Sequence, residues 1–165
     1  MNEIKLNSKL SDDLLKVVVN EDGDAIYINP NDGAFMDRFV RFLSWLDKEE
    51  VRLNKLGEEK EKQYEGRLMV DDNGNADLEQ LIDYATITSE ALETVTAKVE
   101  ELFGQDCIKK YFRAFYAINP DFRPDIDCIN DFVSNIIPAV NTAYNTRMER
   151  LNGKYNKTRR GGKKG

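Results

Sequence analysis

The fold depends most on residues 35–46, whose sequence is FMDRFVRFLSWL. Their large apolar side chains recur at steps of three and four residues, which is the spacing of one face of an α-helix. The same stripe continues more thinly through Leu53 and Leu56. From Asp47 to Glu65 most residues are charged. We therefore expect an amphipathic helix whose first half is packed and whose second half projects into solvent or reaches a neighbouring molecule.

Two short apolar segments before this helix predict a β-hairpin. Residues 14–19 and 25–28 are rich in Leu, Val and Ile, and the turn sequence NEDGD lies between them. Its glycine, Gly23, suits the positive φ that a tight turn requires. Two strands alone are only marginally stable in water. The hairpin, at about residues 14–29, must therefore lie on the helices or pair with the edge of another chain.

A second long apolar stripe follows the polar loop VDDNGNA. Asp77 and Gln80, at the start of this stripe, have the spacing of a capping box. Gly104 stands just after the stripe, where a helix commonly ends. The β-branched run TITS at residues 86–89 leaves open whether residues 77–103 form one helix or two.

A shorter helix with several aromatic residues is expected next. It carries Tyr111, Phe112 and Phe115 on one side, beside basic residues. Stacking of nucleic-acid bases on these rings would explain such a cluster, but ordinary core packing explains the one-sided spacing more simply. We therefore favour packing.

Apolar residues keep the helical period again over residues 126–151. Pro124 suits the first turn of this helix, Pro138 should kink it, and Gly153 should end it. Residues 153–165 hold six basic and no acidic side chains, and we expect this tail to be disordered. The whole chain has 24 basic and 30 acidic residues, so removing those six leaves 18 basic against 30 acidic residues before the tail.

These patterns predict a mainly α protein of the α+β type. It has an N-terminal β-hairpin, about four amphipathic helices and a disordered basic C-terminal tail. We place a single helical domain at residues 1–152 and the flexible tail at residues 153–165. A chain of 165 residues is long enough for one core. The charged fraction of 33% and the net charge of −6 predict high solubility.

The composition argues against catalysis. Histidine is absent, which removes the usual general base, the Ser-His and Cys-His nucleophiles and the commonest metal ligand. A calcium loop that began at Asp71 would need glycine where Ala76 stands and glutamate where Ile82 stands. We therefore expect no enzyme activity, no cofactor and no metal.

Cellular context can also be inferred from the sequence. Cys107 and Cys128 both lie in apolar helical patterns and predict buried free thiols in a reducing compartment. No apolar run approaches the roughly 20 residues that a membrane span needs. The N-terminal sequence has no basic segment followed by an apolar one, so we expect no secretory signal.

Four stretches follow one another along the chain in a characteristic order. They are the aromatic helix at residues 37–47, the helix end VTAKVEELFG at residues 95–104, the apolar helix at residues 132–151 and the basic sequence KYNKTRR at residues 154–160. This order resembles the tail assembly chaperone-like proteins that long-tailed bacteriophages encode between the major tail protein and the tape measure protein. The resemblance covers about residues 26–160.

The resemblance implies a non-enzymatic protein that keeps the tape measure protein soluble and helps the tail tube polymerise around it. Its partners would be the tape measure protein and the major tail protein, with self-association also open. It would act in the cytoplasm of the bacterial host during assembly. The partner contacts would come from the two aromatic helices and from the basic tail. These residues are Phe35, Phe39, Phe42, Trp45, Leu46, Phe112, Phe115, Tyr116, Lys154, Lys157, Arg159 and Arg160.

Two sequence features, Trp45 and the basic tail, each allow more than one interpretation. Trp45 lies between the apolar stripe and the polar side of its helix, a position typical of interface anchors and of residues at the edge of a core. The basic tail suits docking to a protein, a solubilising end without a target, or contact with nucleic acid. We rank nucleic acid last because the acidic body would repel it.

Three other functions stay open. A structural minor tail or connector protein of the virion would bury the charged half of the first long helix in a stable ring. A phage-encoded inhibitor of a host protein would mimic nucleic acid with regularly spaced carboxylates, whereas Glu and Lys alternate from Asp47 to Glu65. A small nucleic-acid-binding protein would bind through the tail and lose affinity steeply as salt increases.

Overall fold

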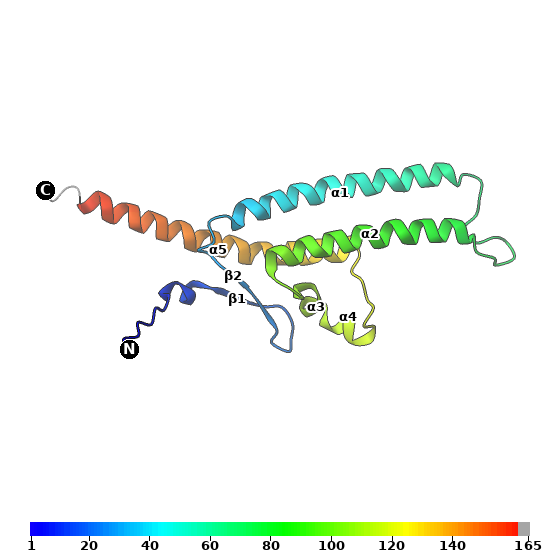
Figure 1. Ribbon diagram of the computed structural model, residues 1–165. Coiled ribbons are helices and arrows are strands. Elements are labelled where there is room, and N and C mark those ends of the chain that lie inside the picture. The colour runs from blue at the N-terminus through cyan, green and yellow to red at the C-terminus, as the bar shows by residue number, and fades with distance from the viewer. Residues whose placement is uncertain (162–165) are drawn as a thin grey trace.

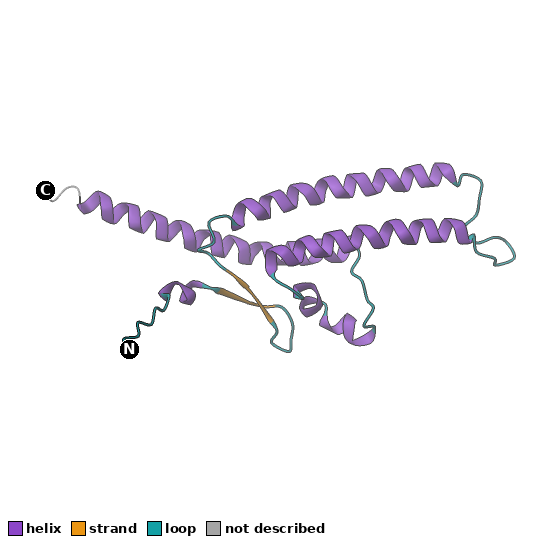
Figure 2. Cartoon of the chain, in the orientation of Figure 1, coloured by secondary structure: helices purple, strands orange, loops and turns teal. Residues whose placement is uncertain are grey.

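The computed structural model of the protein describes the backbone of residues 1–161 and the side chains of residues 1–153. It confirms a mainly α fold with an N-terminal β-hairpin (Figures 1 and 2). Three long helices dominate: α1 (Phe35–Gln63), α2 (Leu78–Phe103) and α5 (Ile126–Gly161). Two short helices, α3 (Cys107–Tyr111) and α4 (Arg113–Ile118), connect α2 to α5.

Helices α1 and α2 form an antiparallel helical hairpin, with the polar loop at its tip (Figure 1). The charged second half of α1 was expected to project into solvent or to reach a neighbouring molecule. Most of its charged side chains are exposed to solvent, and its inner side lies beside the first half of α2, where Lys60 and Tyr64 both bond to Asp83. The helix α2 is continuous through residues 86–89, so the open question about this segment is settled in favour of one helix.

The predicted β-hairpin is confirmed and lies on the helices. A short 3-10 helix (Lys9–Asp13) precedes the strands β1 (Leu15–Val18) and β2 (Ala25–Ile28), which pair antiparallel. Gly23 in the turn has a φ of 88°. Ile26 and Ile28 turn inward and are almost fully buried in the core. The helices therefore cover one face of the sheet, as a two-stranded sheet requires.

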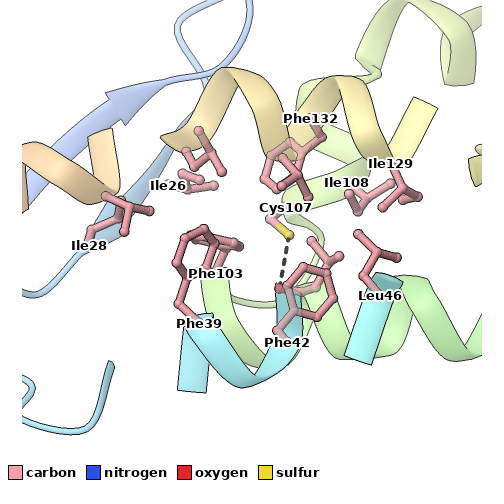
Figure 3. Close-up of a cluster of buried hydrophobic side chains, with 14 of the residues drawn as sticks. Ile26, Ile28, Phe39, Phe42, Leu46, Phe103, Cys107, Ile108, Ile129 and Phe132 are labelled. Carbon is pink, nitrogen blue, oxygen red and sulfur yellow. Dashed lines mark hydrogen bonds between the residues drawn. The ribbon is translucent and has the colours of Figure 1, made fainter. Parts of the chain in front are cut away.

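The core forms where α1, α2, α5 and the hairpin meet (Figure 3). Its centre is Phe103, the last residue of α2. The ring of Phe103 makes edge-to-face contacts with three other rings, at centroid distances of 5.9 Å to Phe35, 6.0 Å to Phe39 and 5.6 Å to Phe132. Such pairs add to the stabilisation from burial alone.

The two cysteines are free, as predicted, but only one is fully buried. Cys107 packs in the core, and burial raises the pKa of its thiol to about 12. Cys128 is half-buried near the start of α5, so the prediction of burial is only partly right for this residue. Within residues 1–161, no helix combines the length and the apolar character needed to cross a membrane.

Three boundaries differ from the sequence-based expectation. The expected single aromatic helix is two helices, because Phe112 leaves the helical conformation at φ −97° and ψ 29°. Pro124 precedes α5 instead of lying in its first turn, and the Asp125 carboxylate accepts a hydrogen bond of 2.8 Å from the N–H of Cys128.

The end of the last helix is the third correction. Helix α5 does not stop at Gly153 but continues to Gly161, so most of the basic segment expected as a disordered tail has a helical backbone. Glycine permits a helix end but does not impose one. Gly153 has no positive φ, in contrast to Gly104, where φ is 100° and α2 does end.

Gly57 and Gly104 provide a matched test of this contrast. A Cβ added at Gly57, inside α1, would meet no atom within 4 Å, so Gly57→Ala should raise the free energy of unfolding by about 0.5–1 kcal/mol. Gly104→Ala should lower it by about 1 kcal/mol or more, because alanine is strained at positive φ. Urea denaturation of both variants measures the difference, and equal effects would contradict the assigned helix end.

Candidate partner-binding surface

The core contains most of the apolar residues that the sequence assigned to a partner. Five of them are at most 7% exposed: Phe35, Phe39, Phe42, Leu46 and Phe112. The closed chain therefore presents almost none of their surface to a partner, although an edge of Phe42 reaches a groove between α1 and α2. Trp45 and Tyr116 are half-buried, and Phe115 is exposed.

Trp45 lies at the edge of the core and also at the surface. Its ring stacks on that of Phe42, with centroids 6.2 Å apart. The ammonium group of Lys98, on α2, lies 4.8 Å from the centre of the Trp45 ring, which is a cation–π distance. Trp45 therefore joins the packed stripe of α1 to the outer side of the α1–α2 seam.

A groove surrounds this tryptophan, and we call it the Trp45 groove. Helix α1 contributes Arg38, Arg41, Phe42 and Trp45, and helix α2 contributes Lys98, Glu101 and Leu102. Its volume is about 310 Å³, close to the lower end of the range for ligand pockets, roughly 300–1,000 Å³. No described residue of α5 lines it, so the described part of α5 leaves this side of the seam uncovered.

The rim of the Trp45 groove carries more positive than negative charge. Arg38, Arg41 and Lys98 face one carboxylate, that of Glu101. Arg38 bonds to Asp32 and Arg41 to Asp37 at 3.0 Å, but neither aspartate lines the groove. The hydrogen bond from Arg38, followed by one from a backbone N–H, holds the pKa of Asp32 below its usual value.

This positive rim lies on an otherwise acidic part of the chain. Residues 71–106 contain ten acidic residues and a single basic residue, Lys98. Lys98 makes no ion pair within residues 1–153, and its ammonium group rests on the Trp45 ring instead. Lys98 is therefore the groove cation that has no carboxylate partner among the described residues, on a helix that is otherwise acidic.

The second aromatic cluster has most of its ring faces covered. Phe115 stacks on Phe122 at 5.2 Å, and Tyr116 meets the same ring edge-on at 5.2 Å. Phe112 and Tyr111 contact each other at 4.7 Å. These contacts favour packing over base stacking. Phe115 remains 51% exposed, so a partner could still contact it.

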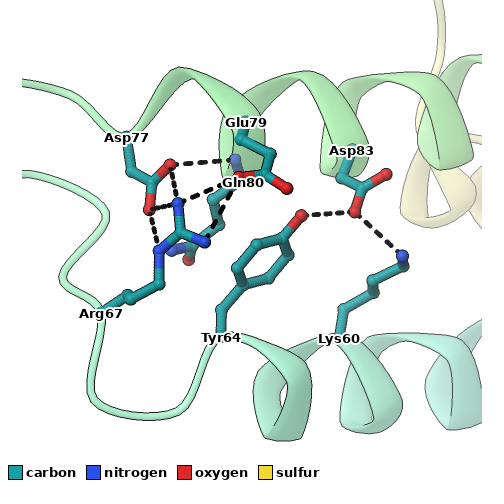
Figure 4. Close-up of polar contacts among 7 residues, drawn as sticks. All are labelled: Lys60, Tyr64, Arg67, Asp77, Glu79, Gln80 and Asp83. Atoms are coloured by element: carbon teal, nitrogen blue, oxygen red, sulfur yellow. Dashed lines mark hydrogen bonds and ion pairs between the residues drawn. The ribbon is translucent and has the colours of Figure 1, made fainter.

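A polar network holds the far end of the helical hairpin together (Figure 4). The Tyr64 hydroxyl donates a hydrogen bond of 2.5 Å to Asp83, to which Lys60 also donates at 2.9 Å. Arg67 binds Asp77 through two hydrogen bonds of 2.7 Å. These bonds fix the register of α1 on α2, on which the shape of the Trp45 groove depends.

The predicted cap of α2 is confirmed in part. The Asp77 carboxylate accepts a hydrogen bond of 3.3 Å from the N–H of Gln80. The second half of a capping box is missing, because the Asp77 N–H donates to the carbonyl of Met69 instead. The side-chain nitrogen of Gln80 is buried without a hydrogen-bond partner in the described part of the chain.

Four predicted contact residues, Lys154, Lys157, Arg159 and Arg160, have backbones in the last turns of α5. Their side chains lie outside the described residues, so their contacts remain predictions. Within the described residues, no three cysteine, aspartate or glutamate side chains gather as metal ligands would.

The sequence-based prediction found Trp45 but missed the charged residues around it. Sequence patterns do not distinguish Arg38, Arg41 and Lys98 from ordinary solvent-exposed charges. They cannot do so because the pairing of α1 with α2 is not predictable from local sequence. One signal was present: Lys98 is the single base in a long acidic stretch.

Comparisons with known proteins give no match for this chain. The chain matches no protein-family model, and neither the characterised proteins nor the solved structures show a significant match to it. The chemistry of the groove is therefore the main guide to function. Apolar side chains beside cations bind a group that is both apolar and anionic.

The hydrogen bond between Tyr64 and Asp83 predicts a specific loss of stability at alkaline pH. That bond, with burial second, raises the pKa of Tyr64 to about 12, whereas a tyrosine in the unfolded chain titrates near about 10. The raised pKa stabilises the fold below pH 10, and this stabilisation is lost as the pH rises towards 12. The stability difference between wild type and Tyr64→Phe should therefore shrink between pH 10 and pH 12.

Urea denaturation from pH 7 to pH 11.5 measures this difference. Tyr144→Phe, at an exposed tyrosine, is the matched control. Its free energy of unfolding should change with pH in the same way as that of the wild type. A constant gap between wild type and Tyr64→Phe over the alkaline range would contradict the proposed role of the Tyr64 hydroxyl.

Proposed function

We propose that the chain is a non-enzymatic phage tail assembly chaperone that binds the tape measure protein and the major tail protein. It would act transiently in the cytoplasm of the bacterial host. The observation that carries this proposal is the Trp45 groove, an open site between two helices on a mainly helical protein. The order of sequence stretches that resembles such chaperones supports it independently.

The physical requirements of the task agree with this surface. A long helical client exposes apolar stripes, and a helix binds best in a groove between other helices. A chaperone for such a client must itself stay soluble, and its acidic surface, with a net charge of −6, opposes aggregation. Trp45 provides the large, rigid side chain that commonly anchors an interface.

The basic end of the chain supplies a second docking element in this proposal. Lys154, Lys157, Arg159 and Arg160 would attract an acidic surface of the tube subunit through charge. Their backbone continues α5 away from the helical hairpin (Figure 1). The two docking elements therefore lie at separate places on the molecule, so one chain can hold two partners.

One structural feature bears on the alternative of a nucleic-acid mimic. Helix α2 carries acidic residues at steps of four, seven, three and seven, which places them on one helical face. They are Glu79, Asp83, Glu90, Glu93 and Glu100. Three of these five pair with basic side chains of the same chain, namely Arg67, Lys60 and Arg123. Because these pairs neutralise much of the stripe, the chaperone remains the function that we favour.

Coexpression with the tape measure protein and the major tail protein of the same phage tests the proposal. The tape measure protein should become soluble and elute with this chain on gel filtration. Trp45→Ala should weaken the complex by about 2 kcal/mol or more, about thirty-fold in affinity, as expected for an anchor residue.

Tyr27→Ala, which removes an exposed aromatic residue of β2 outside the groove, is the matched control and should retain the complex. Circular dichroism establishes that both variants fold. An insoluble tape measure protein beside a stable oligomer of this chain would overturn the proposal and favour a structural virion component.

A further inference from the structure

The shape of the Trp45 groove matches that of an added helix. The groove lies between two antiparallel helices, with lining residues at steps of three and four on each. A third helix can pack along such a seam with its ridges between theirs. Among the described residues only those of α1 and α2 line the groove, so no other described element occupies it.

The floor of the groove is apolar. Its apolar lining residues are Phe42, Trp45 and Leu102, and the stacked pair of Phe42 and Trp45 is held by the core beneath it. The floor is therefore formed before any partner binds. A helix with apolar residues at steps of three, four and seven would bury them against these three side chains.

The rim determines the charge of the partner. Arg38 and Arg41 each hold one carboxylate outside the groove, and a guanidinium with five N–H donors can bind another. Lys98 rests on the Trp45 ring and has all three ammonium donors free of described carboxylates. A partner with carboxylates beside its apolar stripe would pair with all three cations, whereas a basic partner would be repelled by them.

From these contacts we propose that the Trp45 groove binds an acidic amphipathic helix of a partner protein. The apolar stripe of that helix packs on Trp45 and Leu102, over the exposed edge of Phe42, and its flanking carboxylates bind Arg38, Arg41 and Lys98. This inference rests on the proposed function only in taking the groove as a partner site. It adds the chemistry of the partner, which the function alone does not specify.

Binding should be visible in the fluorescence of the protein itself, because Trp45 is the one tryptophan of the chain. A carboxylate that draws Lys98 away from the ring, together with burial of the ring under apolar side chains, changes its emission. The probes are two synthetic helices of about 20 residues, long enough to be helical alone. Both carry the same leucine stripe without aromatic residues, flanked by glutamates in one and by lysines in the other.

The glutamate helix should shift Trp45 emission and bind about tenfold or more tightly than the lysine helix, because several half-exposed charge contacts act together. The double variant Arg41→Glu with Lys98→Glu should reverse this preference. The matched control is Lys55→Glu with Lys62→Glu, which changes the net charge equally at two exposed positions of α1 outside the groove. The control should keep the preference for the glutamate helix.

Equal affinity for the two probe helices would overturn the inference, as would the same loss of binding in the control double variant. Binding of the glutamate helix without any change in Trp45 emission would place it elsewhere and would overturn the inference too. The two proposals fail separately. A protein that prefers the glutamate helix but leaves the tape measure protein insoluble keeps this inference and loses the proposed function.

Discussion

The contact of Phe103 with rings from two other helices is the interaction on which the rest of the structure depends. Phe103 is the last residue of α2, and Gly104 turns the chain immediately after it with a φ of 100°. The ring meets Phe35 and Phe39 of α1 and Phe132 of α5. The end of one helix thus fixes the position of the two others, because edge-to-face packing constrains ring orientation as well as distance.

The Trp45 groove is a consequence of that arrangement. Once Phe39, Phe42 and Leu46 turn inward, the residues one helical step away, Arg38 and Trp45 among them, must lie along the flank of α1. The same holds on α2, where Val95, Val99 and Phe103 form the core; Lys98 and Leu102 therefore face the flank of α1. The core and the candidate partner site are two sides of one helix pair, so a change in helix register alters both.

Local rules predicted most elements well. The strands, the turn at Gly23 and the end of α2 at Gly104 all follow from short sequence patterns, because each depends on a few neighbouring residues. Two of the errors in helix boundaries are of different kinds. Gly153 permits a helix end but remains helical, and Phe112 leaves the helical conformation where its side chain is buried in the core. For the candidate site, the sequence identified Trp45 but also assigned to a partner five residues that the core buries.

The sequence by itself determined the amphipathic stripes, the hairpin and the separation of an acidic body from a basic end. These features depend on hydrophobic periodicity and on charge, both of which can be read from short stretches of sequence. Only the tertiary structure decided which apolar residues are covered and which cations stand together. Arg41 and Lys98 are 57 positions apart and meet at the same groove because α1 and α2 fold back on each other. That pairing is set by the packing of Phe103 and by the bonds of Tyr64 and Arg67, none of which acts through neighbours in the sequence.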